Sequence, residues 1–227
     1  MSKFLPDSLP NLQKLSTILN KPITFIDLET TGMPYENHFA IIEIGLVEIT
    51  PNNVVEKSSF VNPKMKIPSN ISELTHIYDY MVEGKKEFSH YASYVGKIAN
   101  SHILCGYNSK TFDSKGLEKM LKKSRINSTF DNQLDFFHIF LRCRKYFDEI
   151  PGRSGNLTQA CAYHNIRIQG QAHRASYDIA ITALLAEKLL EKYGFGIIHK
   201  DIEKFADAST KKLYYKYIVE NKIKTIS

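Results

Sequence analysis

The sequence of 227 residues contains no tryptophan, only three cysteines and no run of eighteen apolar residues. The cysteines, at positions 105, 143 and 161, have wide and irregular spacing that matches neither a disulfide framework nor a zinc site. Without a long apolar run, no membrane-spanning helix is expected. The stretch MSKFLPDSLPNLQKL also lacks the continuous apolar segment of a secretory signal. We therefore expect a cytoplasmic protein in which Cys105, Cys143 and Cys161 are small buried side chains.

Acidic residues are in the minority: 24 Asp and Glu stand against 30 Lys and Arg, which gives a formal net charge of +6. This balance favours a polyanionic partner such as a nucleic acid, and no membrane partner is expected. Hydrophobic residues make up 43% of the chain, which is enough for one substantial core and one appended segment.

The chain divides into three parts by composition. Residues 1–20 contain Pro6, Pro10 and a short amphipathic piece, so they are expected to form an N-terminal arm, either loose or a single helix. Residues 21–196 carry the regular strand and helix patterns and should form one domain. Residues 197–227 are lysine-rich and are expected to form a basic, helical C-terminal extension.

The central part begins with strand patterns and continues with alternating helix and strand patterns. Three β-branched segments follow one another across short turns, which favours antiparallel neighbours: 22–29, 40–50 and 53–63. Helical spacing then dominates, interrupted by two further strand candidates, at 102–108 and just before Asp135. Helical turns are expected over 69–84. Helices are expected at 88–100, 113–124, from about Asp135 to 147, 155–166 with Asn156 as N-cap, and 176–194. This order predicts an α/β fold with a mixed sheet.

The stretch TFIDLETTG places two acids directly after a buried strand pattern. Residues two apart on a strand point to the same face, about 6.6 Å apart, so Asp27 and Glu29 project together. Two buried carboxylates at that distance repel each other unless a cation lies between them. Oxygen ligands of this kind suit Mg²⁺ or Mn²⁺. The alternative is that both acids lie at an exposed strand end and are only solvated.

Two more acids and a histidine occur at the starts of predicted helices. Asp113 follows GYNSKTF, and Asp178 lies five residues after His173 in HRASYD. Taken singly, each acid is explained as a favourable charge at a helix N-terminus, and the histidine as a surface side chain. Together with Asp27 and Glu29 they form an ordered set of four acids at element ends, beside a histidine that can accept a proton from water.

These motifs resemble those of the DEDDh branch of the DnaQ-like 3′→5′ exonucleases. FIDLETTG is similar to the first motif of that family, GYNSKTFD to the second and AHRASYD to the third, and the resemblance covers residues 21–193. A sister branch has tyrosine four residues before the last aspartate, where this chain has Arg174. The resemblance implies a ribonuclease H-like fold, a mixed five-stranded sheet flanked by helices.

The resemblance also implies a reaction. A metal-dependent enzyme of this kind hydrolyses phosphodiester bonds from a free 3′ end and releases nucleoside 5′-monophosphates by a two-metal mechanism. Asp27, Glu29, Asp113 and Asp178 would hold two Mg²⁺ or Mn²⁺ ions, and His173 would be the general base. The residues that would bind the substrate are Leu28, Thr30, Thr31, His76, Ile77, Asn108 and Phe112.

The expected partner is a single-stranded nucleic acid, with DNA slightly favoured over RNA. Two other interpretations stay open at this point. The chain could be a proofreading subunit that works with a DNA polymerase, or a catalytically idle module that only binds nucleic acid. The intact set of four acids and a histidine argues against the idle module.

Overall fold

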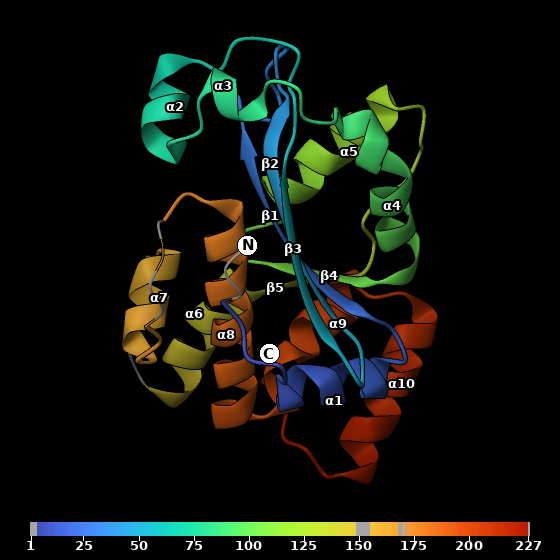
Figure 1. The fold of residues 1–227 in the computed structure, drawn as a ribbon. Coiled ribbons are helices and arrows are strands. Elements are labelled where there is room, and N and C mark those ends of the chain that lie inside the picture. Colours follow the sequence, from blue (N-terminus) through green and yellow to red (C-terminus); the bar gives the residue numbers. More distant parts are fainter. Residues whose placement is uncertain (1–3, 149–154, 168–169, 171, 227) are drawn as a thin grey trace.

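The computed structural model describes residues 4–148, 155–167, 170 and 172–226. Within these residues, five strands form one mixed sheet in the order β3-β2-β1-β4-β5 (Figure 1). The strands are β1 (Ile23–Thr30), β2 (Ile41–Ile49), β3 (Val54–Phe60), β4 (Ile103–Gly106) and β5 (Gln133–Asp135). The first three are antiparallel neighbours, whereas β4 runs parallel to β1 and to β5. The predicted α/β fold with a mixed sheet is therefore confirmed.

Helices cover both faces of the sheet (Figure 1). They are α1 (Pro10–Leu19), α2 (Ser69–Thr75), α3 (Asp79–Val82), α4 (Phe88–Ser101), α5 (Asp113–Lys123), α6 (Phe136–Phe147), α7 (Leu157–Tyr163), α8 (Ala175–Tyr193), the 3₁₀ helix η1 (Phe195–Ile198), α9 (His199–Phe205) and α10 (Ala208–Glu220). Residues of α1, α6 and α8 share a core with one face, and residues of α4 and α5 share a core with the other. In the part of the chain described here, no helix is long and apolar enough to cross a membrane.

Three helix ends follow capping signals in the sequence. Asn156 caps α7 as predicted, in a reciprocal capping box with Gln159. The side chain of Asp135 accepts a hydrogen bond from the Phe137 N–H and so begins α6. Gly194, with φ of +76°, ends α8 in a conformation that favours glycine. The stripe of α8 predicted to face inward, Ile179, Ala183, Ala186 and Leu190, is buried.

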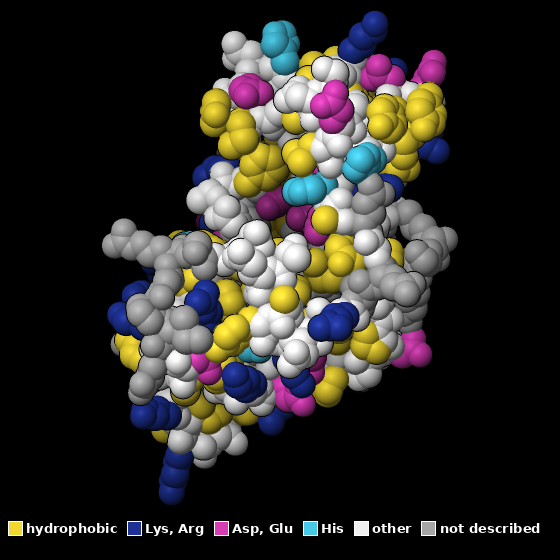
Figure 2. All heavy atoms as spheres, turned by 90° about the vertical axis from the view of Figure 1, so that its left-hand side faces the viewer, with side chains coloured by type: hydrophobic (Ala, Val, Ile, Leu, Met, Phe, Trp, Pro, Cys, Tyr) yellow, Lys and Arg dark blue, Asp and Glu magenta, His cyan; other side chains and the backbone are white. Residues whose placement is uncertain are grey.

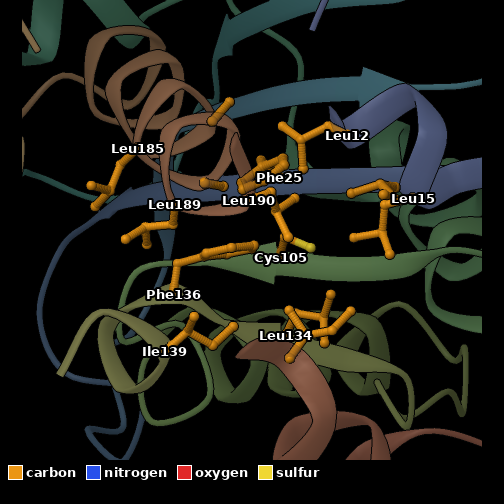
Figure 3. Close-up of a cluster of buried hydrophobic side chains, with 14 of the residues drawn as sticks. Leu12, Leu15, Phe25, Cys105, Leu134, Phe136, Ile139, Leu185, Leu189 and Leu190 are labelled. Carbon is orange, nitrogen blue, oxygen red and sulfur yellow. The ribbon is translucent and has the colours of Figure 1, made fainter. Parts of the chain in front are cut away.

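The largest core lies between the sheet and the helices α1, α6 and α8 (Figure 3). Phe25 of β1 stacks on Phe136 of α6 with ring centroids 5.6 Å apart, and Leu189 of α8 packs into the same cluster. The three cysteines are all free and buried, as expected. This core fixes the orientation of α8 on the sheet, and α8 carries the last of the acidic motifs.

The N-terminal arm contains helix α1, and this helix packs into the same core. Leu12 and Leu15 are fully buried beside the sheet residues (Figure 3). The Glu187 carboxylate of α8 accepts hydrogen bonds of 2.9 Å from the backbone N–H groups of Asn11 and Leu12. An acid placed there satisfies free N–H groups at the start of α1. Of the two expectations for the arm, a loose segment or a single helix, the structure shows the helix. The boundary at residue 20 stays a prediction.

The C-terminal extension is helical and also packs against the domain. Tyr214 of α10 is fully buried, and its hydroxyl donates to the Phe195 carbonyl at 3.1 Å. Asp201 of α9 pairs with Lys110 at 3.0 Å and with Arg142. Lys110 belongs to the second acidic motif, so the extension supports the segment that leads to Asp113.

The segment 69–84, where helical turns were expected, forms two separate helices in the structure. Helix α2 ends at His76, which adopts the left-handed conformation with φ of +55°. Ile77 then enters a small core with Ile42, Ile67 and Val82, and α3 begins at Asp79. Local apolar spacing did not reveal this break, because Ile77 packs against Ile42 and Ile67, which lie outside this segment.

Leu15→Ala is expected to lower the free energy of unfolding by about 2–5 kcal/mol, because it empties a fully buried site in the shared core. Thr17→Ala on the exposed side of the same helix is the control and should change it by about 0.5 kcal/mol or less. Urea unfolding of both variants measures the difference. Equal, small effects would mean that the arm does not contribute to the core.

Candidate active site

The alternation of β1 places Asp27 and Glu29 on the face covered by α8. Ile23 and Phe25 belong to the core beneath α8, whereas Ile26 and Leu28 belong to the core beneath α4 and α5. Because residues two apart on a strand share a face, Asp27 and Glu29 point to the same side as Ile23 and Phe25. β4 pairs with β1 only as far as Phe25, so both acids lie beyond its end. A register shift follows Glu29, and irregularities of this kind re-aim side chains near active sites.

A glycine on the neighbouring strand allows α8 to approach these acids. Gly45 of β2 is the register partner of Asp27. A Cβ atom at Gly45 would lie 2.5 Å from the Ala175 carbonyl oxygen, a distance at which the helix would have to move. Asp178 follows three residues later on α8. Ligand oxygens of Asp27, Glu29 and Asp178 consequently lie within 4.8 Å of one another.

Asp113 reaches the same place from the other side. It is the first residue of α5, it is buried, and its Oδ1 accepts a hydrogen bond of 3.0 Å from the Leu28 N–H. The loop before it is fixed by Asp135, whose carboxylate accepts from the Asn108 N–H at 2.9 Å. Asp113 does not belong to the group within 4.8 Å, but it lines the same cleft.

His173 lies at the edge of the cleft, on the turn that leads into α8. Its side chain is exposed, and its backbone has a φ of +60°. The His173 N–H donates to Asp178 Oδ2 at 2.8 Å. The turn thus ties the histidine to one of the three clustered acids.

The acids form part of the lining of a cleft of about 620 Å³. Figure 2 shows acidic side chains recessed in a hollow of this face, with histidine at its edge. Of the residues predicted to bind the substrate, Leu28, Thr30, Thr31, Asn108 and Phe112 line the cleft. His76 and Ile77 are not among the lining residues, and Ile77 is fully buried. The sequence did not single out Met33, Leu74 or Tyr107, which line it as well.

A family model described as "Exonuclease" matches residues 24–186, which include all four acids and His173. The chain belongs to the exonuclease family. Two similar relatives are the 3′-5′ exonuclease DinG of Bacillus subtilis (31% identical over 74% of this chain) and a PolC-type DNA polymerase III of Ureaplasma parvum (28% over 72%). The matches cover 17% and 11% of those two proteins, so the chain spans about a fifth or less of the length of such relatives.

Solved structures of exonucleases share the fold. E. coli Exonuclease I in complex with a dA16 oligonucleotide superposes with a TM-score of 0.64 at 15% identity, over 89% of this chain and 44% of that one. The nuclease domain of a DEDDh family member bound to rAMP gives 0.61 at 20% identity, over 76% and 92%. The predicted membership in the exonuclease family and the predicted ribonuclease H-like fold are thus confirmed.

The carboxyl groups of this exonuclease domain have raised pKa values. Burial, followed by the charges of Asp113 and Glu29, raises the pKa of Asp27 well above its ordinary value. Burial and the charge of Asp178 raise the pKa of Glu29 to about 8. Burial raises the pKa of Asp113 to about 7 and also raises that of Asp178, against the hydrogen bond from His173. Acids gathered in one cleft, with pKa values raised in this way, call for a compensating cation.

The donor set fits a hard divalent cation. It consists of carboxylate oxygens from β1 and α8, half-buried and open to the cleft. Mg²⁺ and Mn²⁺ prefer such ligands, whereas zinc and copper sites are built mainly from histidine and cysteine. In the part of the chain that the structure describes, this is the group of acids and histidines that meets the geometry for a metal.

One ion pair beside the cleft was not predicted from the sequence. Glu43 is buried on β2, and its carboxylate accepts from Arg174 Nε at 3.1 Å and from Arg174 Nη2 at 3.2 Å. An acid in the middle of the apolar stretch AIIEIGLVEI is the signal that could have revealed it, because a buried carboxylate needs a partner. The identity of that partner depends on the tertiary fold.

Asp27→Asn should make the metal-free protein more stable at pH 8 and reduce its pH dependence. The folded-state pKa of Glu29, about 8, lies above its ordinary 4.5, so the folded form holds extra protons and loses stability as pH rises between these values. The loss is at most about 1.4 kcal/mol per pH unit for each proton. Removing the charge of Asp27 relieves its repulsion on the neighbouring carboxyls.

Urea unfolding in EDTA at pH 5 and pH 8 measures this effect. Asp131→Asn, an exposed acid outside the cleft, is the control and should behave as the wild type. Added Mn²⁺ should stabilise the wild type at pH 8 more than it stabilises Asp27→Asn. The proposed repulsion would be contradicted if the stability of the wild type in EDTA rose between pH 5 and pH 8 and Asp27→Asn showed the same rise.

Proposed function

We propose that the chain is a metal-dependent 3′→5′ exonuclease that hydrolyses phosphodiester bonds at a free 3′ end and releases nucleoside 5′-monophosphates. The observation that carries this proposal is the convergence of Asp27, Glu29 and Asp178 within 4.8 Å in an open cleft that His173 also lines. A phosphodiester is an anion, and an acidic cleft repels it unless cations are bound there. The arrangement therefore suits a metal-dependent reaction on nucleic acid.

Asp27, Glu29 and Asp178 would hold two divalent ions, Mg²⁺ or Mn²⁺, with Asp113 contributing from the side of α5. When bound, such ions lower the pKa of water and neutralise charge on the phosphate and the leaving oxygen. The raised pKa values of the carboxyls fit this role, because a cation restores their charged form.

His173 would accept the proton of the attacking water. Imidazole titrates near neutral pH and can take up a proton and release it to solvent. The ring lies at the exposed edge of the cleft, so both water and substrate reach it. Its backbone link to Asp178 keeps it beside the acids.

The 3′ end would enter between β1 and α2. Leu28, Thr30 and Thr31 line one part of the cleft, and Asn108 and Phe112 another. Met33 and Leu74, which line it as well, are 40% and 50% exposed, so apolar surface is available for unpaired bases. This surface supports a single-stranded end as substrate. A slight preference for DNA and a substrate role for His76 and Ile77 stay predictions.

A second candidate function is exonuclease activity as part of a larger polymerase or repair enzyme. It is favoured by the similarity to a PolC-type DNA polymerase III and to DinG, each several times longer than this chain. Both names concern those proteins. Partnership with a polymerase and a cytoplasmic location stay predictions for this one.

Labelled single-stranded DNA and RNA oligonucleotides, incubated with Mg²⁺ or Mn²⁺, test the proposal. A ladder that shortens from the 3′ end, disappears with EDTA and is absent in Asp27→Ala is expected, because Asp27 is the acid on which the other charges converge. The two oligonucleotides also reveal the sugar preference. A full-length product in every lane of the wild type would overturn the proposal.

His173→Ala in the same assay should slow hydrolysis by roughly 10²–10⁴-fold, the usual contribution of one acid-base group. His90→Ala is the matched control, an exposed histidine on α4 that is outside the cleft lining. It should leave the rate unchanged. A near-normal rate for His173→Ala would remove the histidine from its assigned role.

A further inference from the structure

The conformation of His173 requires support from its surroundings. With φ of +60°, its backbone lies in the left-handed region, which is unfavourable for a residue other than glycine. The side chain is exposed, so packing does not hold it. The hydrogen bond from its own N–H to Asp178 holds the turn at His173. A second contact is needed after His173, and the next residue supplies it.

Arg174 provides that second point through a fork-on-fork ion pair with Glu43. Its Nε and Nη2 atoms donate to the two carboxylate oxygens at 3.1 and 3.2 Å. The Glu43 side chain is only 3% exposed and that of Arg174 25% exposed. The guanidinium also lies 5.0 Å from the centre of the Phe60 ring on β3. A bidentate pair held in this way fixes direction as well as distance.

The same carboxylate also holds the start of α8. The Ala175 N–H donates to Glu43 Oε2 at 3.2 Å, so Glu43 receives donors from the two residues that follow His173. Because Glu43 lies opposite Glu29 in the register of β1 and β2, this anchor belongs to the same pair of strands as the clustered acids. Hydrogen bonds between β1 and β2 therefore fix the position of His173 relative to Asp27 and Glu29.

We propose that the Arg174–Glu43 pair is a positioning device that sets His173 over the carboxylate cluster, a role that rests on the function proposed above. Arg174 and Glu43 are absent from the cleft lining, and Glu43 is buried, so we assign the pair a positioning role and not a catalytic one. Without the bidentate pair, the imidazole of His173 is still present, but the turn that carries it can change conformation and move the ring. Misplacement by about 1 Å costs up to roughly 100-fold in rate, and this loss falls on kcat and leaves KM unchanged.

Two substitutions of Arg174 test the device. Arg174→Lys keeps the charge and removes the fork, and Arg174→Met removes both while keeping an unbranched side chain. Lys188→Met, which removes an exposed cation from the same helix, is the control. On a labelled oligonucleotide with saturating Mn²⁺, both Arg174 variants should lower kcat by about 10–100-fold at unchanged KM, whereas the control stays at the wild-type rate.

The decisive comparison repeats each substitution in the His173→Ala background. If Arg174 acts through His173, its loss has almost no further effect once the imidazole is gone. The same fold-loss in both backgrounds would show that the pair supports the fold or the metal ligands instead, and would overturn the proposal. A wild-type kcat in Arg174→Met would overturn it equally.

An NMR measurement on the metal-free full chain separates this proposal from the proposed function. The ring resonances of His173, assigned from their loss in His173→Ala, should shift or broaden in Arg174→Met, while those of His90 stay in place. Unchanged His173 resonances in a folded Arg174→Met protein would refute the positioning role whatever the activity. A wild type that is inactive on every oligonucleotide refutes the exonuclease assignment, and the NMR result still decides the positioning role.

Discussion

Repulsion among the carboxylates at the end of β1 is the constraint on which the arrangement of this domain depends. Asp27 and Glu29 lie on one face of a strand, and Asp178 is brought to them by a helix from another part of the chain. Burial and mutual repulsion raise their pKa values, so the metal-free cluster opposes the folding that creates it. The folded state keeps these carboxylates together because contacts elsewhere in the fold hold their strands and helices in place, and a bound cation can offset the repulsion between them.

The fold holds the cluster from two sides. On one face of the sheet, α8 is fixed by the core around Phe25 and Leu189, and Gly45 allows its first turn to come close to β2. On the other, Asp113 hydrogen-bonds to the backbone of Leu28, and Asp135 fixes the loop that precedes it. Holding like charges close together lowers the stability of the folded state, and such an arrangement is typical of catalytic sites.

The acids and the histidine were predictable from sequence because each lies at an element end. Asp27 and Glu29 lie in the second half of β1, beyond the apolar residues Ile23, Phe25 and Ile26. Asp113 is the first residue of α5, and Asp178 lies in the first turn of α8. The sheet class and the stripe on α8 followed from local periodicity in the same way.

Tertiary contacts decided what local patterns did not reveal. The break at His76 depends on Ile77 packing against Ile42 and Ile67. The ion pair of Glu43 with Arg174 joins residues 131 positions apart, and neither residue alone signals the other. Burial of α1 and α10 against the domain likewise depends on surfaces that distant segments supply. Sequence periodicity reports which side of an element is apolar, but it does not report which segment covers it.

A crystal structure of the protein soaked in Mn²⁺, with anomalous data, tests the central claim most directly. Anomalous density between the carboxylates of Asp27, Glu29 and Asp178, lost in crystals of Asp27→Asn, is the predicted result. Saturating Mn²⁺ with no density at these three carboxylates, or with the Asp27 side chain turned away from the other two, would contradict the view that the cluster exists to bind a divalent cation.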